Sequence, residues 1–69
     1  MRTQIATYKN AKDGLEARIY LNHGSAFPYT VEMWDMDADE CALAKTVDNL
    51  DRAQSFGRAF CGESYSFEV

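Results

Sequence analysis

The alternation of apolar and polar side chains predicts four strands before residue 48. It is clearest over residues 15–21, where every second side chain is apolar, as a half-buried strand requires. β-branched and aromatic residues indicate strands at 3–9 and 29–36. The segment 41–47 is assigned as a shorter strand, although its alanines keep a helix as the rival interpretation. Turn-forming sequences such as Asp-Gly at 13–14 separate these segments, so we expect a meander of hairpins.

After residue 47 the apolar period changes to that of a helix. Asp48 is the expected N-cap, and Asp51 lies in the first turn, where the helix dipole favours a carboxylate. Gly62 is expected to end the helix, and residues 64–69 alternate again and predict a final strand. The side of the helix expected to face the sheet consists of Leu50, Ala53, Gly57, Phe60 and Cys61, with Phe56 at its margin.

The order of these elements restricts the topology. In a meander the fourth strand runs opposite to the first, and a helix that reverses the chain makes the fifth strand parallel to the fourth. The fifth strand is therefore antiparallel beside the first. We predict an α+β fold of topology β-β-β-β-α-β, with a five-stranded antiparallel sheet in the order 5-1-2-3-4 and one helix packed on one face. Residues 1–69 are taken as a single domain because they are too few for a second core.

Charge is distributed unevenly along the chain, whose net charge is −4. Residues 32–51 contain seven acidic side chains against Lys45 alone, whereas residues 1–31 are net positive and 52–69 are neutral. An acidic stretch repels the phosphate backbone, so we expect no direct nucleic-acid binding. A basic protein surface is the better matched partner. The alternative is that the excess of acids only keeps the protein in solution.

The remaining composition favours a cytoplasmic protein without a cofactor. No apolar stretch approaches the ~20 residues of a membrane span, and the N-terminus lacks the apolar region of a signal peptide. Cys41 and Cys61 lie far apart, and His23 is the only histidine, so the close-spaced ligand pairs of a zinc site are missing. We expect two reduced thiols and no metal, and the sequence leaves open whether the two cysteines ever pair.

Two further patterns of carboxylates fall short of a chemical site. Residues 35–40 match the first, third and fifth positions of a calcium loop, but Glu40 stands where the loop needs glycine and Thr46 where a bidentate glutamate should close it. Glu32 and Asp35 alternate onto opposite faces of their strand and make a poor acid–base dyad. We therefore expect that the protein is not an enzyme.

The face of the sheet turned away from the helix is the more informative one. The inward side chains are expected to face the helix, Leu43 and Phe67 among them. Tyr20, Trp34 and Met36 then lie on the open face, with Tyr8 as a candidate fourth member. Aromatic side chains flanked by acids are typical of protein interfaces. Two alternatives remain: an RNA-stacking sheet, which would need a basic groove, or aromatic pairs that only stabilise the sheet.

A small acidic chain with a hairpin sheet, one helix and an exposed Trp34 resembles phage-encoded anti-CRISPR and anti-restriction proteins. The acid-dense run that carries this resemblance spans residues 32–40. The resemblance implies an inhibitor without catalysis that occupies the basic DNA-binding or PAM-reading surface of an effector complex, sometimes as a DNA mimic. It also implies action in the cytoplasm of the host cell.

We therefore predict a non-catalytic protein whose acidic surface docks on a basic partner, such as a subunit of a CRISPR effector. This prediction needs the carboxylates between positions 32 and 51 to form one outward patch beside an uncovered tryptophan. The alternative is a structural or homo-oligomeric accessory protein, a monomer or weak homodimer that pairs through the aromatic face of the sheet. The residues predicted to bind the partner are Glu32, Trp34, Asp35, Asp37, Asp39, Glu40 and Tyr20.

Overall fold

The computed structural model describes residues 2–62 and, as backbone only, residues 66–68. Most elements begin and end within two residues of the positions expected from the hydrophobic pattern. Along the chain they are β1 (Arg2–Asn10), β2 (Leu15–Asn22), β3 (Tyr29–Asp35), β4 (Glu40–Val47), α1 (Leu50–Cys61) and β5 (Ser66–Glu68).

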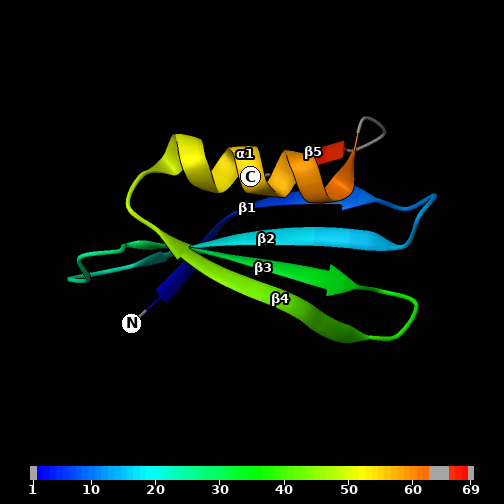
Figure 1. Cartoon of the computed structure of the whole chain (residues 1–69), viewed down its shortest axis with the longest axis horizontal. Helices are drawn as coiled ribbons and strands as arrows, with labels where there is room; N and C mark the ends of the chain where they lie inside the picture. Colours follow the sequence, from blue (N-terminus) through cyan, green and yellow to red (C-terminus); the bar gives the residue numbers. More distant parts are fainter. Residues whose placement is uncertain (1, 63–65, 69) are drawn as a thin grey trace.

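The strands form an antiparallel sheet in the order β4-β3-β2-β1-β5, and α1 lies across one face of it (Figure 1). The predicted α+β class, with an antiparallel sheet and one helix packed on it, is confirmed. Four long strands, β1 to β4, make up most of the sheet. Of the strand expected at 64–69, the structure describes a three-residue segment that pairs with β1, and residues 64, 65 and 69 lie outside the described residues. The described residues contain no helix long and apolar enough to cross a membrane.

The helix begins one residue later than expected, because Asn49 rather than Asp48 is its N-cap. The Asn49 side-chain oxygen accepts a hydrogen bond from the backbone N–H of Arg52 at 2.8 Å and so satisfies an amide that the helix leaves free. Asp48 instead forms an exposed ion pair with Arg52 at 3.8 Å. Gly62 ends the helix as expected, with a positive φ of 76° and its N–H donating to the carbonyl of Arg58.

Small side chains allow α1 to lie close to the sheet. Ala53, Gly57 and Cys61 form its buried side, and Gly57 lies directly over the ring of Tyr8. Tyr8 is only 3% exposed and faces the helix, so it is not a member of the open face, contrary to the prediction. The bulge in β1 after Gln4 shifts the alternation and turns this ring toward the helix. The buried core consists of Ala6, Tyr8, Ala17, Ile19, Val31, Met33, Val47, Ala53 and Cys61.

The helix covers the middle of the sheet and leaves β4 largely bare. Leu43 faces the helix side as expected, as its pairing with Met33 shows, but it is 48% exposed because α1 leaves this part of β4 uncovered. The side chain of Phe67, also expected to face the helix, lies outside the described residues. Leu50 is also exposed, and Phe60 is half-buried against the core. A single helix about 10 Å wide spans roughly two strand spacings of about 4.8 Å. It therefore cannot bury an outer strand as well.

A buried asparagine joins the first hairpin to the end of the helix. Asn10 is 2% exposed, and its side-chain amide donates to the carbonyl of Cys61 at 2.6 Å and to the Asp13 carboxylate at 3.0 Å. Its side-chain oxygen accepts from the Asp13 backbone N–H at 3.1 Å. The turn between β1 and β2 and the last turn of α1 are thus held together by one side chain.

Candidate interaction surfaces

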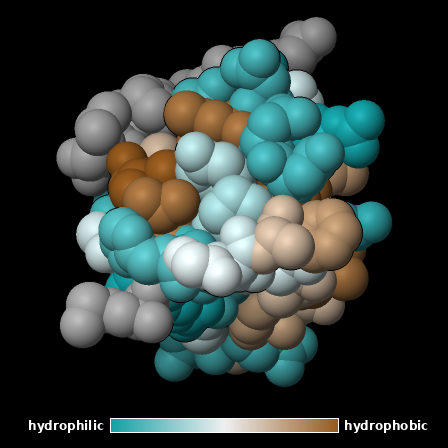
Figure 2. Space-filling model, turned by 90° about the vertical axis from the view of Figure 1, so that its left-hand side faces the viewer, coloured by the Kyte–Doolittle hydropathy of each residue, from teal (hydrophilic) through white to brown (hydrophobic). Residues whose placement is uncertain are grey.

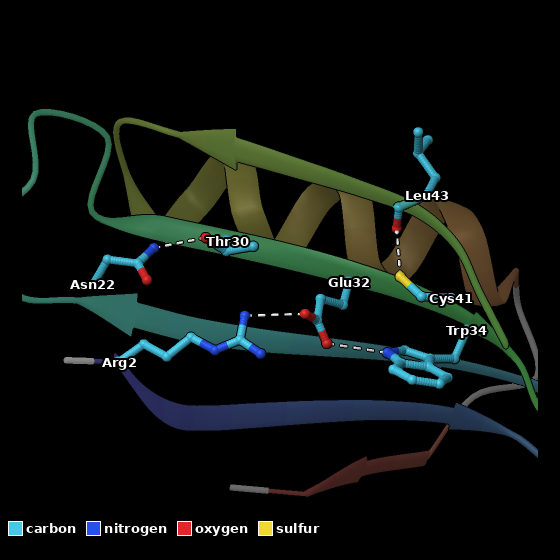
Figure 3. Close-up of polar contacts among 7 residues, drawn as sticks. All are labelled: Arg2, Asn22, Thr30, Glu32, Trp34, Cys41 and Leu43. Atoms are coloured by element: carbon cyan, nitrogen blue, oxygen red, sulfur yellow. Dashed lines mark hydrogen bonds and ion pairs between the residues drawn. The ribbon is translucent and has the colours of Figure 1, made fainter.

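The open face of the sheet carries a row of aromatic and charged side chains that contact one another. Arg2 lies 4.1 Å from the ring centroid of Tyr20 and forms an ion pair with Glu32 at 3.0 Å. The other carboxylate oxygen of Glu32 accepts a hydrogen bond from Trp34 Nε1 at 3.1 Å. Figure 3 shows the contacts of Glu32 with Arg2 and Trp34 on the near side of the sheet, with the helix behind it. These residues come together because they lie on neighbouring strands and on the same face of the sheet.

The row of contacting side chains continues from the indole of Trp34 to a second guanidinium, that of Arg18. Arg18 lies over the Trp34 ring at 4.4 Å and forms an ion pair with Glu16, which is 8% exposed. The hydrogen bond to Glu16 raises the pKa of Arg18, and burial opposes this only in part. Trp34 is consequently half-buried rather than uncovered. Because both Tyr20 and Trp34 are covered by guanidinium groups, the open face offers compensated charges rather than a bare aromatic surface for self-association.

Glu32 belongs to this network more than to any free acidic surface. Burial alone would raise the pKa of Glu32, but the hydrogen bonds from Trp34 and Arg2, with the charges of Arg2 and Arg18, outweigh it and lower the pKa. The carboxylate therefore stays ionised while holding two neighbouring side chains. Because both of its carboxylate oxygens already accept hydrogen bonds, Glu32 holds Arg2 and Trp34 in place rather than offering a free charge to a partner.

The four remaining predicted acids lie at the turn between β3 and β4. Asp35 Oδ1 accepts hydrogen bonds from the backbone N–H groups of Asp37 at 3.1 Å and Ala38 at 3.3 Å, and so stabilises the turn. Asp39 adopts a left-handed backbone with φ 54°, which aspartate tolerates better than most residues. Asp37, Asp39 and Glu40 are exposed. This hairpin confirms the grouping of these acids on one solvent-facing turn.

The structure adds a fifth carboxylate that the sequence argument did not include. The N–H of Met36 donates to the carbonyl of Gly14 at 2.7 Å, so the β1–β2 and β3–β4 turns lie side by side (Figure 1). Alternate hairpins of a meander turn at the same end of the sheet, and that rule could have found Asp13. Within residues 2–62 none of these carboxylates has an ion-pair partner. We call this surface the acidic end, and it consists of Asp13, Asp35, Asp37, Asp39 and Glu40.

The other acids between positions 32 and 51 lie elsewhere. Asp48 and Asp51 flank the start of α1, beyond the far end of β4 from Glu40. Seven steps along a strand separate the two ends of β4 by about 23 Å. Figure 2 views this other end and shows hydrophilic side chains gathered at its top, where α1 begins. The structure thus divides these carboxylates among three places, the open face, the acidic end and the start of the helix, instead of one patch.

The side chains suited to metal or thiol chemistry are dispersed. The described part of the chain holds no group of three or more His, Cys, Asp or Glu side chains arranged around a common metal position. Both cysteines are free: Cys41 is exposed on β4, and Cys61 is buried with its thiol 3.4 Å from the carbonyl oxygen of Tyr8. Burial raises the pKa of Cys61. His23 is exposed in the loop between β2 and β3.

No protein-family model matches this chain, and comparison with curated proteins and with solved structures gives no match.

Proposed function

We propose that this protein is a non-catalytic binding module that docks its acidic end on a basic protein surface. The observation that carries the proposal is the meeting of two turns, through which five carboxylates without ion-pair partners in residues 2–62 share one end of the molecule. Lys12 is the single cation in these two turns. Such a concentration of one sign of charge attracts and orients a cationic partner before contact.

Apolar groups beside the acidic end supply the contact that follows encounter. Met36 is 39% exposed in the turn itself. Trp34 lies in the strand that leads into this turn, and its position is fixed by Glu32 and Arg18. A tryptophan held in one orientation loses little side-chain freedom on binding and can serve as an anchor. Tyr20, further along the open face, lies under the Arg2 guanidinium and adds to this surface only at its uncovered edge.

The specific form of the proposal concerns the partner. The resemblance to small anti-CRISPR and anti-restriction proteins points to the DNA-binding or PAM-reading surface of such a complex. Surfaces of this kind are built from lysine and arginine because they neutralise phosphates. A protein with an exposed acidic end would compete with DNA for them, acting in the cytoplasm of the cell that contains the complex.

A competition experiment tests the proposal directly. Purified CRISPR effector and restriction complexes are titrated with the protein, and their DNA binding is followed by mobility shift at low and high salt. We expect inhibition that weakens as salt rises, because the attraction acts between exposed charges. The Asp37→Asn/Asp39→Asn variant should inhibit at least several-fold less. The matched control is Asp48→Asn/Asp51→Asn, which removes the same charge from the start of the helix and should inhibit like the natural protein.

Two results would count against the proposal. If none of the complexes loses DNA binding, the partner class is wrong. If the two variants inhibit equally, general negative charge is responsible and the acidic end has no special role.

A further inference from the structure

The outer strand β4 presents a free edge. It is the last strand of the sheet, and seven of its eight residues are exposed. Figure 1 shows no described segment alongside its outer edge. Glu40 and Lys45 are its only charged residues. An edge strand of this length with few charges exposes unpaired backbone groups that can pair with another strand.

An exposed apolar side chain lies in the middle of this edge. Leu43 is 48% exposed on the helix side, and its side chain extends beyond the ribbon of β4 in Figure 3. Phe56 of α1 is 36% exposed on the same side, with the Lys45 ammonium 5.2 Å from its ring. A strand added at this edge would therefore gain apolar contacts as well as backbone hydrogen bonds.

A bulge makes the edge symmetric about Leu43. Met33 pairs with Leu43 and Trp34 pairs with Cys41, so Ala42 is an extra residue in β4. Counted in strand positions, Glu40 then lies two steps from Leu43 on one side, and Lys45 lies two steps away on the other. Without the extra residue these two charges would not be equidistant from the centre.

The same register places both charges on one face. In the pairing with β3, Glu40 lies opposite Asp35 and Lys45 opposite Val31, positions that share the helix side of the sheet. Within residues 2–62 neither charge has an oppositely charged partner, although the Lys45 ammonium lies over the Phe56 ring. The edge therefore carries one acid and one base, equally spaced from its apolar centre.

We propose that two copies of this chain pair antiparallel through β4, with a two-fold axis at Leu43, to form one continuous sheet. In this register Leu43 meets Leu43 of the second copy. Each Glu40 lies opposite Lys45 of the other copy, which gives two equivalent ion pairs. A strand of another protein would meet this edge without that reciprocal match of charge, which is why the occupant is a second copy. The interface is small, so the dimer is weak and concentration-dependent.

A cross-link tests the register. Directly opposite residues of antiparallel strands have Cα atoms about 4.5–5.5 Å apart, within the range that a disulfide spans. In a Cys41→Ser background, Leu43→Cys should give a covalent dimer under mild oxidation. The matched control is Thr46→Cys, whose counterpart would lie six strand positions away, about 20 Å, and should stay monomeric. Equal cross-linking of both variants, or none with Leu43→Cys, would overturn the proposal.

Charge reversal tests the ion pairs independently. Sedimentation equilibrium of the natural protein, from about 1 µM to about 1 mM, should show a monomer–dimer equilibrium. Glu40→Lys or Lys45→Glu alone should weaken the dimer on the order of tenfold, because like charges then face each other. The double exchange should restore it, because opposite charges face each other again. A protein that remains monomeric, a dimer indifferent to these changes, or one dissociated by Trp34→Ala through the open face would contradict the proposal. None of these outcomes depends on the function of the acidic end.

Discussion

A Cβ atom added to Gly57 would lie 2.9 Å from Cδ2 of Tyr8, so the helix rests on this ring with no side chain between them. The same added atom would lie 3.5 Å from the Cβ of Ala17, an ordinary contact. The ring of Tyr8 therefore sets how closely α1 approaches the sheet. Glycine is required here by the neighbouring ring and not by a special backbone conformation.

We expect Gly57→Ala to destabilise the protein, although alanine is the better helix former. The gain in helix propensity is at most about 1 kcal/mol, whereas overpacking against a buried ring costs about 1–3 kcal/mol. Urea unfolding measures the difference. Ala59→Gly, on the exposed side of the same helix, is the control, and its stability should fall only by the difference in helix propensity between alanine and glycine. A Gly57→Ala protein more stable than the natural one would show that the ring can move aside.

Arg18→Ala should lower stability by about 1–2 kcal/mol, because it removes the cation over Trp34 and leaves the buried Glu16 without its partner. Trp34 is the only tryptophan, so its fluorescence reports the change directly. We expect emission to shift to longer wavelength as the ring meets more water. Arg58→Ala, an exposed helix arginine, should change neither quantity; an equal response would mean that Arg18 does not shield the indole.

The lowered pKa of Glu32 predicts how stability depends on pH. A carboxyl with a lower pKa in the folded state stabilises the protein above its unfolded pKa, about 4.3, and loses that contribution as pH falls through the folded value. Glu32→Gln should therefore be less stable than the natural protein at pH 7, and the difference should shrink by about pH 3. Thermal unfolding at the two pH values measures it. Glu40→Gln serves as the exposed control, and a difference of equal size at both pH values would exclude the charge of Glu32 as the cause.

The two cysteines should react with a thiol reagent in separate phases. Cys41 is exposed, whereas Cys61 is buried with a raised pKa, so little of its thiolate forms in the folded protein. With a disulfide reagent at pH 8 and low protein concentration, we expect one thiol to react quickly. The second should react only as fast as the protein opens around Cys61. Cys41→Ser should remove the fast phase. Two fast thiols in the natural protein would show that α1 detaches readily.

The sequence predicted the hairpins well because their signals are local. The alternation over 15–21 and the Asp-Gly turn each act within a few residues, and the structure contains both features. The N-cap was misplaced by one residue because Asp48 and Asn49 are both good capping residues. Only the backbone angles of Asn49 bring its side chain to the free amide.

The remaining errors came from relationships between distant residues. Tyr8 was misplaced because the bulge near Ile5, which shifts its face, leaves no mark in the alternation. The prediction of a single acidic patch was wrong because the full length of β4 lies between Glu40 and Asp48. Conversely, Asp13 joined the acidic end through a contact between two turns that lie more than twenty residues apart.

The hydrogen bond from Asn10 to the carbonyl of Cys61 joins positions 51 residues apart. A nascent chain that has emerged from the ribosome only as far as β4 has its hairpins but not the helix that shields them from water. The apolar side of the sheet then stays uncovered until the residues of α1 have emerged as well. The hairpins made first therefore pass through an interval in which their apolar side meets water, and aggregation is expected to be greatest before α1 packs on them.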